Sequence, residues 1–252
     1  MTDRLAQSRK HWDDLGRLDP FHAILSKPGT RFGRWDLDEF FATGQREIAE
    51  LMESAARIGI PKRRNRALDF GCGMGRLTLP LGEYFEECIG VDISDSMIRQ
   101  AQELCKSARC HFLLNDRPTL PFPNEDFDLI YTSIVLQHVP QKALIRGYIS
   151  EFVRTLRKDG LLVMQIPSHI KLRNRLQPKR RLYEFLRGVG VSESYLYQTL
   201  RLTPMLMNFL PEREVFRVVE TAGGRMLPSV PDELAPYKRA SHIASRIYYV
   251  TK

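Results

Sequence analysis

The sequence predicts an α/β fold built on one doubly wound sheet of seven strands. Short apolar runs alternate with helix-patterned segments from about residue 66 onward, which is typical of a parallel sheet with crossover helices. The chain has 252 residues, of which 43% are hydrophobic and 27% charged, enough for one well-buried core. We therefore interpret residues 1–252 as a single domain with an N-terminal helical cap (1–60), a core (61–167), a lid insertion after strand five (168–210) and a closing helix with strands (211–252).

The first half of the core shows the alternation most clearly. Its expected elements are strand Arg66–Phe70, helix Gly73–Phe85, strand Glu87–Asp92, helix Ser94–Ala108 and strand Cys110–Asp116. Ser94 or Asp95 is a suitable N-cap for the second helix, because a short side-chain oxygen accepts hydrogen bonds from the first free amides.

The second half continues the pattern and then changes. A fourth strand within Phe127–Leu136 is apolar enough to be buried on both faces. We expect a long helix over Gln141–Gly160, with Gly160 as its stop, and a fifth strand at Leu161–Pro167. The insertion that follows is basic first and rich in aromatic and methionine residues later. The closing elements are helix Glu212–Gly224 and strands Arg225–Val230 and Ser245–Lys252.

The segment before the first strand contains both tryptophans, Trp12 and Trp35, and is helix-patterned from about Leu37. We interpret it as a helical cap. Helices that only complete the packing of the sheet are an equally good interpretation.

Three glycines follow the first strand as G-x-G-x-G: Gly71, Gly73 and Gly75. This differs from the G-x-G-x-x-G of a dinucleotide fold. Ligands of open α/β sheets bind beyond the carboxyl ends of the strands, and glycine leaves no Cβ in their way. Asp69 ends the first strand, where it can accept hydrogen bonds from an ammonium group. Asp92 ends the second, at close to the ~20-residue spacing of a ribose-binding acid.

Asn115 and Asp116 end the third strand, where an adenine amino group could donate to them. Three neighbouring strand ends thus offer partners for a methionine, a ribose and an adenine. Together they describe S-adenosylmethionine as the ligand.

Four segments in this order, "LDFGCGMGRL", "GVDISDSMI", "LPFPNEDFDLIYTSIVLQHV" and "LRKDGLLVMQIP", resemble the motifs of class I S-adenosylmethionine-dependent methyltransferases, which have a Rossmann-like fold. The resemblance runs from about Arg66 to Pro167. It implies that the glycine loop passes under the methionine part, that Asp92 holds the ribose, and that Ile93 and Met97 pack on the adenine. The full implied cofactor set is Asp69, Gly71, Gly73, Gly75, Arg76, Asp92, Ile93, Met97, Asn115, Asp116 and Ser133.

His138 is the candidate catalytic residue, since we expect it at the end of strand four, beside the methyl group. The family resemblance leaves two roles open: a general base, as in some sugar O-methyltransferases, or a wall of the pocket. The Asn/Asp-Pro-Pro-aromatic motif of base amino-methyltransferases is absent, and no cysteine follows Cys110. Both absences argue against base methylation. No metal site is predicted, although pairs of strand-end acids could bind magnesium.

The charge is uneven. The chain carries a formal net charge of +8, and residues 168–188 hold one acid, Glu184, against seven basic residues: Lys171, Arg173, Arg175, Lys179, Arg180, Arg181 and Arg187. A basic lid suits an anionic group such as phosphate or carboxylate. The aromatic half, with Tyr195, Tyr197, Met205, Met207 and Phe209, suits an apolar or sugar-like acceptor or simple core packing.

We therefore expect O-methylation of a small-molecule, glycan or lipid-linked acceptor that bears an anionic group. An RNA methyltransferase is the first alternative, favoured by the high isoelectric point, and an inactive cofactor-binding partner subunit is the second. The four cysteines lack disulfide or zinc spacing, and neither a signal segment nor a membrane span is visible, so we expect a cytoplasmic protein. The oligomeric state stays open.

Overall fold

The sheet of the computed structural model has the order β3-β2-β1-β4-β5-β8-β6, and the two-residue β7 also pairs with β8. The structure describes residues 2–171, 175–227, 230–231 and 243–252. Its strands are β1 (Arg66–Phe70), β2 (Glu87–Asp92), β3 (Cys110–Leu114), β4 (Phe127–Thr132), β5 (Leu156–Ile170), β6 (Arg225–Met226), β7 (Val230–Pro231) and β8 (Ile243–Thr251). The first five pair in parallel, and β6, β7 and β8 pair antiparallel. The predicted doubly wound sheet is confirmed, with seven strands in its main order and the two-residue β7 as an eighth strand beside β8.

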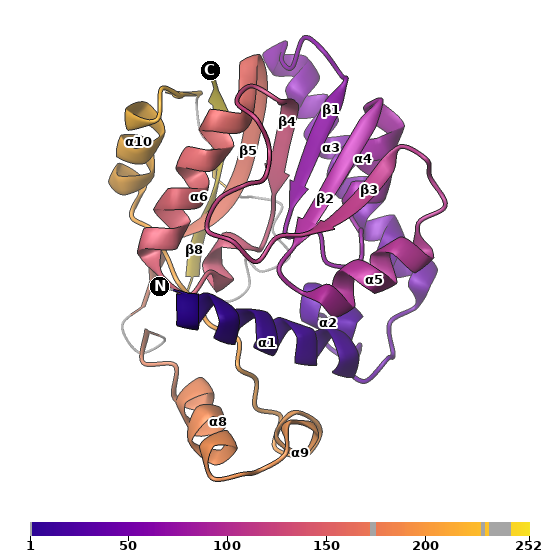
Figure 1. The fold of residues 1–252 in the computed structure, drawn as a ribbon, viewed down its shortest axis with the longest axis vertical. Coiled ribbons are helices and arrows are strands. Elements are labelled where there is room, and N and C mark those ends of the chain that lie inside the picture. The colour runs from indigo at the N-terminus through magenta and orange to yellow at the C-terminus, as the bar shows by residue number, and fades with distance from the viewer. Residues whose placement is uncertain (1, 172–174, 228–229, 232–242) are drawn as a thin grey trace.

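Helices cover both faces of this sheet, with α6 and α10 on one face and α3 and α4 on the other (Figure 1). The helices are α1 (Thr2–Leu18), α2 (Pro20–Ile24), α3 (Leu37–Ile58), α4 (Thr78–Tyr84), α5 (Asp95–Leu104), α6 (Lys142–Thr155), α8 (Pro178–Gly188), α9 (Glu193–Gln198) and α10 (Glu212–Thr221). The predicted N-terminal helices are thus present. The helix α1 lies across the carboxyl ends of the strands, with α2 beside it, whereas α3 packs against the sheet.

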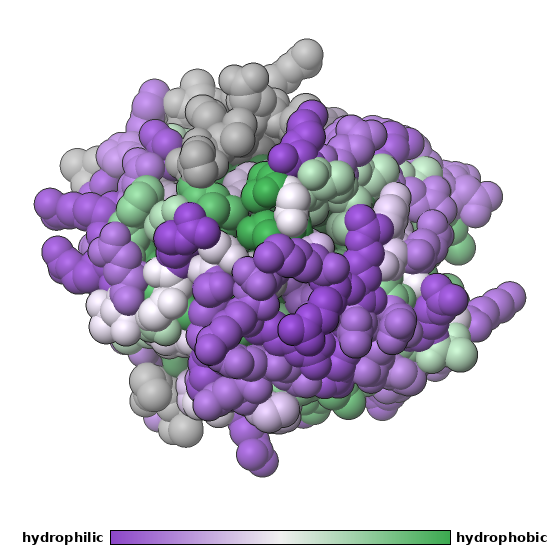
Figure 2. Space-filling model, turned by 90° about the horizontal axis from the view of Figure 1, so that it is seen from above, coloured by the Kyte–Doolittle hydropathy of each residue, from purple (hydrophilic) through white to green (hydrophobic). Residues whose placement is uncertain are grey.

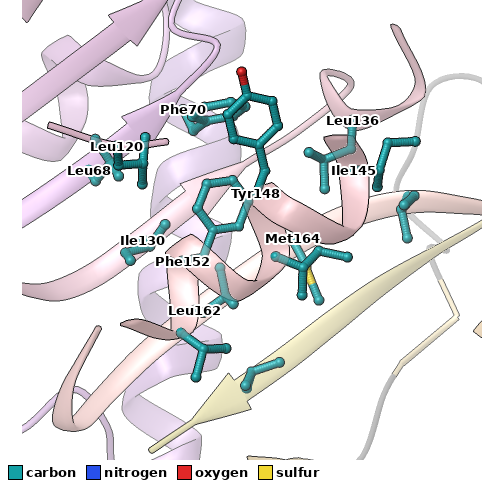
Figure 3. Close-up of a cluster of buried hydrophobic side chains, with 14 of the residues drawn as sticks. Leu68, Phe70, Leu120, Ile130, Leu136, Ile145, Tyr148, Phe152, Leu162 and Met164 are labelled. Atoms are coloured by element: carbon teal, nitrogen blue, oxygen red, sulfur yellow. The ribbon is translucent and has the colours of Figure 1, made fainter. Parts of the chain in front are cut away.

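The core divides into two clusters, one for each face of the sheet. Phe152 and Tyr148 of α6 pack on Phe70 and Ile130 in the first cluster (Figure 3). Their rings lie 4.8–4.9 Å from the Phe70 ring, a distance favourable for aromatic pairs. Ile48 and Leu51 of α3 belong to the second cluster. Apolar side chains on both faces explain why the central strands read as continuous apolar runs.

The predicted helix over Gln141–Gly160 is wrong at its end. The helix α6 stops at Thr155, and Leu156 already pairs with Phe127 in the sheet. Gly160 lies inside β5 rather than at a helix stop. A Cβ there would lie 2.9 Å from the Arg157 oxygen and 3.0 Å from the Asp128 oxygen, so close backbone approach accounts for this glycine.

Several other boundaries also differ from the predictions. The helix α4 begins at Thr78 rather than Gly73, because the glycine loop fills residues 73–77, and α5 and β3 end at Leu104 and Leu114. Ser94 is the N-cap of α5, as predicted, and accepts from the Met97 amide. The strand β5 runs three residues past Pro167, so the insertion begins later than Ser168. The strand β6 covers only Arg225–Met226 of the predicted Arg225–Val230, of which residues 228–229 lie outside the described residues.

The helix α1 is fastened to α5. The Asp13 carboxylate accepts from the Ser94 hydroxyl at 2.9 Å and from the Ser96 amide at 3.0 Å. Gln100 donates to the Gly16 oxygen at 3.0 Å. The helices α8 and α9 lie beyond α1, at the end of the molecule away from the sheet (Figure 1). The opposite end, seen in Figure 2, is mostly hydrophilic.

Candidate active site

A cavity lies between α1 and the carboxyl ends of β1, β2 and β4. The parallel register places these ends together, since Phe70 pairs with Val91, and Asp69 pairs with Tyr131. The cavity contains about 980 Å³ of empty space, part of it open to solvent. Residues from the glycine loop, the ends of β2 and β3, the turn after β4 and α1 line it together.

The glycine loop supplies the floor of the cavity through Gly71 and Gly73. Their φ angles are +79° and +53°, in the left-handed region that glycine adopts without a Cβ penalty. A Cβ on Gly73 would lie 2.7 Å from Ile24 Cδ1, and one on Gly71 would overlap the Val135 side chain. The loop therefore requires glycine at both positions. Gly75, with φ +83°, does not line the cavity and instead approaches the Phe112 ring.

Asp92 lines the cavity and also fixes the loop. Its carboxylate accepts from the Gly73 amide at 2.9 Å and from the Ser94 amide at 2.8 Å. Burial raises the pKa of Asp92, and the backbone amides of Ser94 and Gly73 oppose that shift. Each carboxylate oxygen can accept more than one hydrogen bond, so acceptor capacity remains for hydroxyl groups of a ligand.

Of the two polar residues after β3, only Asn115 reaches the cavity. Its side-chain amide nitrogen is buried without a hydrogen-bond partner in the described structure. A buried, unpaired donor of this kind is costly unless a ligand or water satisfies it. Asp116 is exposed and pairs with Arg9 of α1 at 2.6 Å, so the structure places it at the α1 contact instead.

Asp69 lies behind the loop rather than in the cavity wall. It is 1% exposed and accepts from the Thr78 hydroxyl at 2.6 Å. Burial raises its pKa to about 7. Arg76 lines the cavity and donates to Glu47 at 2.8 Å, while its buried Nε has no partner in the described structure.

The remaining predicted cofactor residues, Ile93, Met97 and Ser133, all line the cavity. Ile134 follows Ser133 with a φ of +64°, which is rare for a β-branched residue. Its amide donates to Gln165 at 2.7 Å, a contact that holds this turn in place. Backbone strain of this kind is concentrated at ligand sites.

His138 lies in a 3₁₀ helix, Leu136–His138, and not at the end of β4, which stops at Thr132. It lines the cavity and makes an edge contact with the Trp12 ring at 5.3 Å. Its Nδ1 lies 2.7 Å from the Leu206 oxygen, so Nδ1 carries the proton and Nε2 keeps a lone pair. Burial lowers the pKa of His138 to about 4. The side chain is therefore neutral at pH 7 and only weakly basic.

A second hollow lies on the other side of Trp12 and His138, between α1 and α8. Trp12, His138, Ser8 and Pro140 line both spaces. Among the seven predicted basic residues, Arg180 lines this hollow, together with Arg4 and His11 of α1. Arg173 lies outside the described residues.

The aromatic and methionine residues of the insertion do not form one surface. Met205 lines the second hollow, and Tyr197 is buried, donating to Asp19 at 3.0 Å. Tyr195 is exposed, and the Phe209 ring packs under Lys142 and Arg175.

The sequence did not indicate the α1 contribution to the cavity, made by Leu5, Ser8 and Trp12, nor that of Tyr148 from α6. The spacing of Leu5, Ser8 and Trp12 places them on one face of a helix, but this pattern is as typical of core packing as of a ligand site. Among the described residues, no three His, Cys, Asp or Glu side chains are grouped to hold a metal ion. No helix in the described ranges is long and apolar enough to cross a membrane.

Comparison with known proteins identifies methyltransferases that resemble part of the chain. Residues 67–160 match a family model described as a methyltransferase domain. The chain is 30% identical over 165 residues to the 2-methyl-6-phytyl-1,4-hydroquinone methyltransferase of Synechocystis, covering 65% of this chain and 51% of that protein. It is 33% identical over 95 residues to the malonyl-[acyl-carrier protein] O-methyltransferase of Salmonella typhimurium, covering 38% and 36%. The matches thus span less than two thirds of either relative.

The fold also matches a solved structure over nearly its full length. The magnesium protoporphyrin IX methyltransferase of Synechocystis, solved with bound S-adenosylhomocysteine, superposes with a TM-score of 0.62 at 17% identity, covering 98% of this chain and 99% of that one. At this identity the likeness concerns the fold.

Proposed function

The chain carries a class I S-adenosylmethionine-dependent methyltransferase domain, and from this premise we propose that it methylates a carboxylate oxygen of a small-molecule, glycan or lipid-linked acceptor. The observation that carries the proposal is a hollow with net positive charge, lined by Arg4, Arg180 and the single acid Glu184, which shares the Trp12–His138 wall with the cofactor cavity.

The residues of the cavity fit S-adenosylmethionine. Gly71 and Gly73 leave room for the methionine part, Asp92 has acceptor capacity for ribose hydroxyls, and Asn115 has an unpaired buried amide for adenine. Asp69 lies behind the loop, and positive charge in the nearby cavity would lower its pKa from about 7. Asp116 does not line the cavity, but it forms an ion pair with Arg9 of α1, the helix that covers the cavity.

When bound, S-adenosylmethionine supplies a methyl group that its sulfonium already activates. The protein then has to align an acceptor oxygen and exclude water. Trp12 and His138 stand at the junction of the two spaces, where they can hold the acceptor. Arg4 supplies positive charge for an anionic group, while the charge of Arg180 is balanced by its ion pair with Glu184 in the same hollow.

The weak basicity of His138 favours an acceptor that needs no base. A carboxylic acid with a pKa near 4 is ionised at pH 7, whereas an alcohol must lose a proton during transfer. A buried imidazole with a pKa of about 4 is a poor general base at pH 7. We therefore assign His138 the role of a neutral wall of the pocket, whose Nδ1 donates to the Leu206 oxygen and whose Nε2 accepts from the Gln137 amide at 3.2 Å.

The test is a screen for S-adenosylhomocysteine release with matched pairs: carboxylic acids and their amides, phenols, sugars and short RNAs. We expect release with an acid and none with its amide. Arg180→Ala should raise KM for the acid at least tenfold with little change in kcat. Lys179→Ala, an exposed neighbour on the same helix, serves as the control.

The pH profile separates the two roles of His138. The wild-type rate should stay flat between about pH 6 and 9, because His138 is neutral throughout this range. His138→Gln should keep most of kcat. A rate that rises with pH through a histidine-like pKa, and that is largely lost in His138→Gln, would instead support the role of His138 as a general base. Release driven only by RNA would support the RNA alternative.

A further inference from the structure

The helix α8 turns an apolar face away from the protein. Leu182, Phe185 and Val189 are 49%, 67% and 64% exposed. Leu182 and Phe185, at i and i+3, lie on one side of the helix, and Val189 is the C-cap residue one turn after Phe185, so these side chains form one stripe. Figure 1 places α8 at the end of the molecule, beyond α1. Leu176, just before the helix, is also exposed, at 54%.

Basic side chains border this stripe. Lys179 and Arg181 are both exposed and lie on opposite flanks of Leu182 on the helix surface. The single acid of the helix, Glu184, is paired with Arg180 at 2.5 Å. The outer surface of α8 therefore combines apolar side chains with two positive charges that have no ion-pair partner among the described residues.

The other side of α8 is fixed to the protein, which sets the orientation of the stripe. Tyr183 is buried with Leu196 and Leu202. Arg187 pairs with Glu193 of α9 at 2.7 Å, and Arg180 donates to the Pro204 oxygen at 3.3 Å. With its inner face occupied in this way, α8 presents the apolar stripe outward as a preformed surface.

We propose that this surface, defined by Lys179, Arg181, Leu182, Phe185 and Val189, docks on a bilayer containing anionic phospholipid. An amphipathic helix with apolar residues on one side and lysine or arginine beside them lies in the plane of a membrane interface. Anionic headgroups attract the flanking cations, and the acyl boundary accepts the apolar stripe. Nucleic acid would use the cations but has no need of Phe185 and Val189 as a continuous stripe.

This inference does not depend on the proposed function, because membrane docking needs neither cofactor nor acceptor. Its consequence for the site is geometric. Arg180, on the inner side of α8, lines the hollow beside His138, so a docked α8 would hold that hollow next to the membrane surface.

The test is co-sedimentation of the full chain with vesicles, either of phosphatidylcholine alone or of two parts phosphatidylcholine to one part phosphatidylglycerol. We expect binding to the anionic vesicles, weaker binding to the neutral ones, and loss of binding at high salt. Phe185→Asp should abolish binding. Leu37→Asp is the matched control, because Leu37 is 47% exposed in the first turn of α3, where an acid is tolerated.

The charge contribution has its own pair of variants. Lys179→Gln/Arg181→Gln should weaken partitioning roughly 25-fold, about fivefold for each basic residue near an anionic surface. Arg213→Gln/Arg217→Gln, which removes the same charge from α10, should have little effect. The melting temperature of each variant checks that it is folded.

Three results would overturn the proposal. Wild-type protein that stays in the supernatant with both vesicles is one, and equal binding by wild type and Phe185→Asp is another. The third is a dimer in solution that Phe185→Asp dissociates, with no vesicle binding, since the stripe would then be a contact between two copies of the chain.

Discussion

We expect cofactor binding to depend most directly on Asp92. Asp92→Ala would remove the proposed hydrogen bonds to ribose together with the loop contacts to Gly73 and Ser94. Two hydrogen bonds to a charged group contribute roughly 3 kcal/mol or more. We expect the affinity for S-adenosylhomocysteine to fall about 100-fold by calorimetry.

Asp95→Ala is the control for this prediction, since Asp95 is an exposed neighbour paired with Arg99 on the surface of α5. Wild-type affinity in a folded Asp92→Ala variant would contradict the ribose assignment.

Asp69 makes stability depend on pH. Burial raises its folded pKa to about 7, so the native state binds the proton more tightly than the unfolded state does. Folding stability should therefore be lost as pH rises from about 4 to about 7 and stay reduced above that. In ligand-free protein, Asp69→Asn should remove this loss and raise the free energy of unfolding by up to about 4 kcal/mol at pH 8.

Thermal unfolding at several pH values checks the Asp69 prediction. The melting-temperature advantage of Asp69→Asn should be small at about pH 4 and largest above pH 7. An advantage that is the same at every pH would show that the carboxyl is not held protonated. Asp95→Asn should give no comparable pattern.

At the scale of elements, α1 covers the cavity at the carboxyl ends of the strands. Its Asp13 carboxylate joins α1 to the first turn of α5, where free amides need acceptors. Leu5, Ser8 and Trp12 of the same helix line the cavity. Loosening the contact with α5 should therefore open the cavity without changing the glycine loop.

Asp13→Ala should weaken S-adenosylhomocysteine binding about tenfold, the loss of roughly 1.4 kcal/mol. It should also expose α1 to limited proteolysis. Asp3→Ala, in the first turn of the same helix, is the control. If Asp13→Ala bound the ligand normally and resisted protease as the wild type does, α1 would be only a packing element.

The boundaries of helices and strands show which parts of the fold could be predicted from the sequence. The boundaries of β1 and β2 are as predicted, because each is an apolar run bounded by polar residues or glycine. The end of α6 was missed because Leu156–Gly160 continues an amphipathic pattern, and pairing with Phe127 decides its state. Tertiary contacts override local preference at such positions.

The residues of the candidate site also include some that could be predicted from the sequence and some that could not. Gly71, Gly73, Asp92 and Asn115 line the cavity as their strand-end positions predicted. Asp116 does not, because its partner is Arg9, far away in the sequence. No local signal links the two, and none predicts that α1 crosses the strand ends.

At the scale of the whole molecule, the cavity joins parts of the chain that are distant in sequence: α1, the glycine loop, the turn after β4 and α6. A ligand in it bridges these parts and binds the native state only. Its binding must therefore raise the stability of the entire fold.

This linkage gives a quantitative prediction. S-adenosylhomocysteine at 100 times its Kd should stabilise the wild type by about 2.7 kcal/mol, a rise in Tm of roughly 5–10 °C for a chain of this size. At that same concentration, an Asp92→Ala variant with 100-fold weaker affinity gains only about 0.4 kcal/mol, or roughly 1 °C. Asp13→Ala should fall between them. Scanning calorimetry at fixed ligand concentration checks the order. Equal shifts in all three would mean that the ligand binds outside the cavity, because neither Asp92 nor α1 would then contribute to its site.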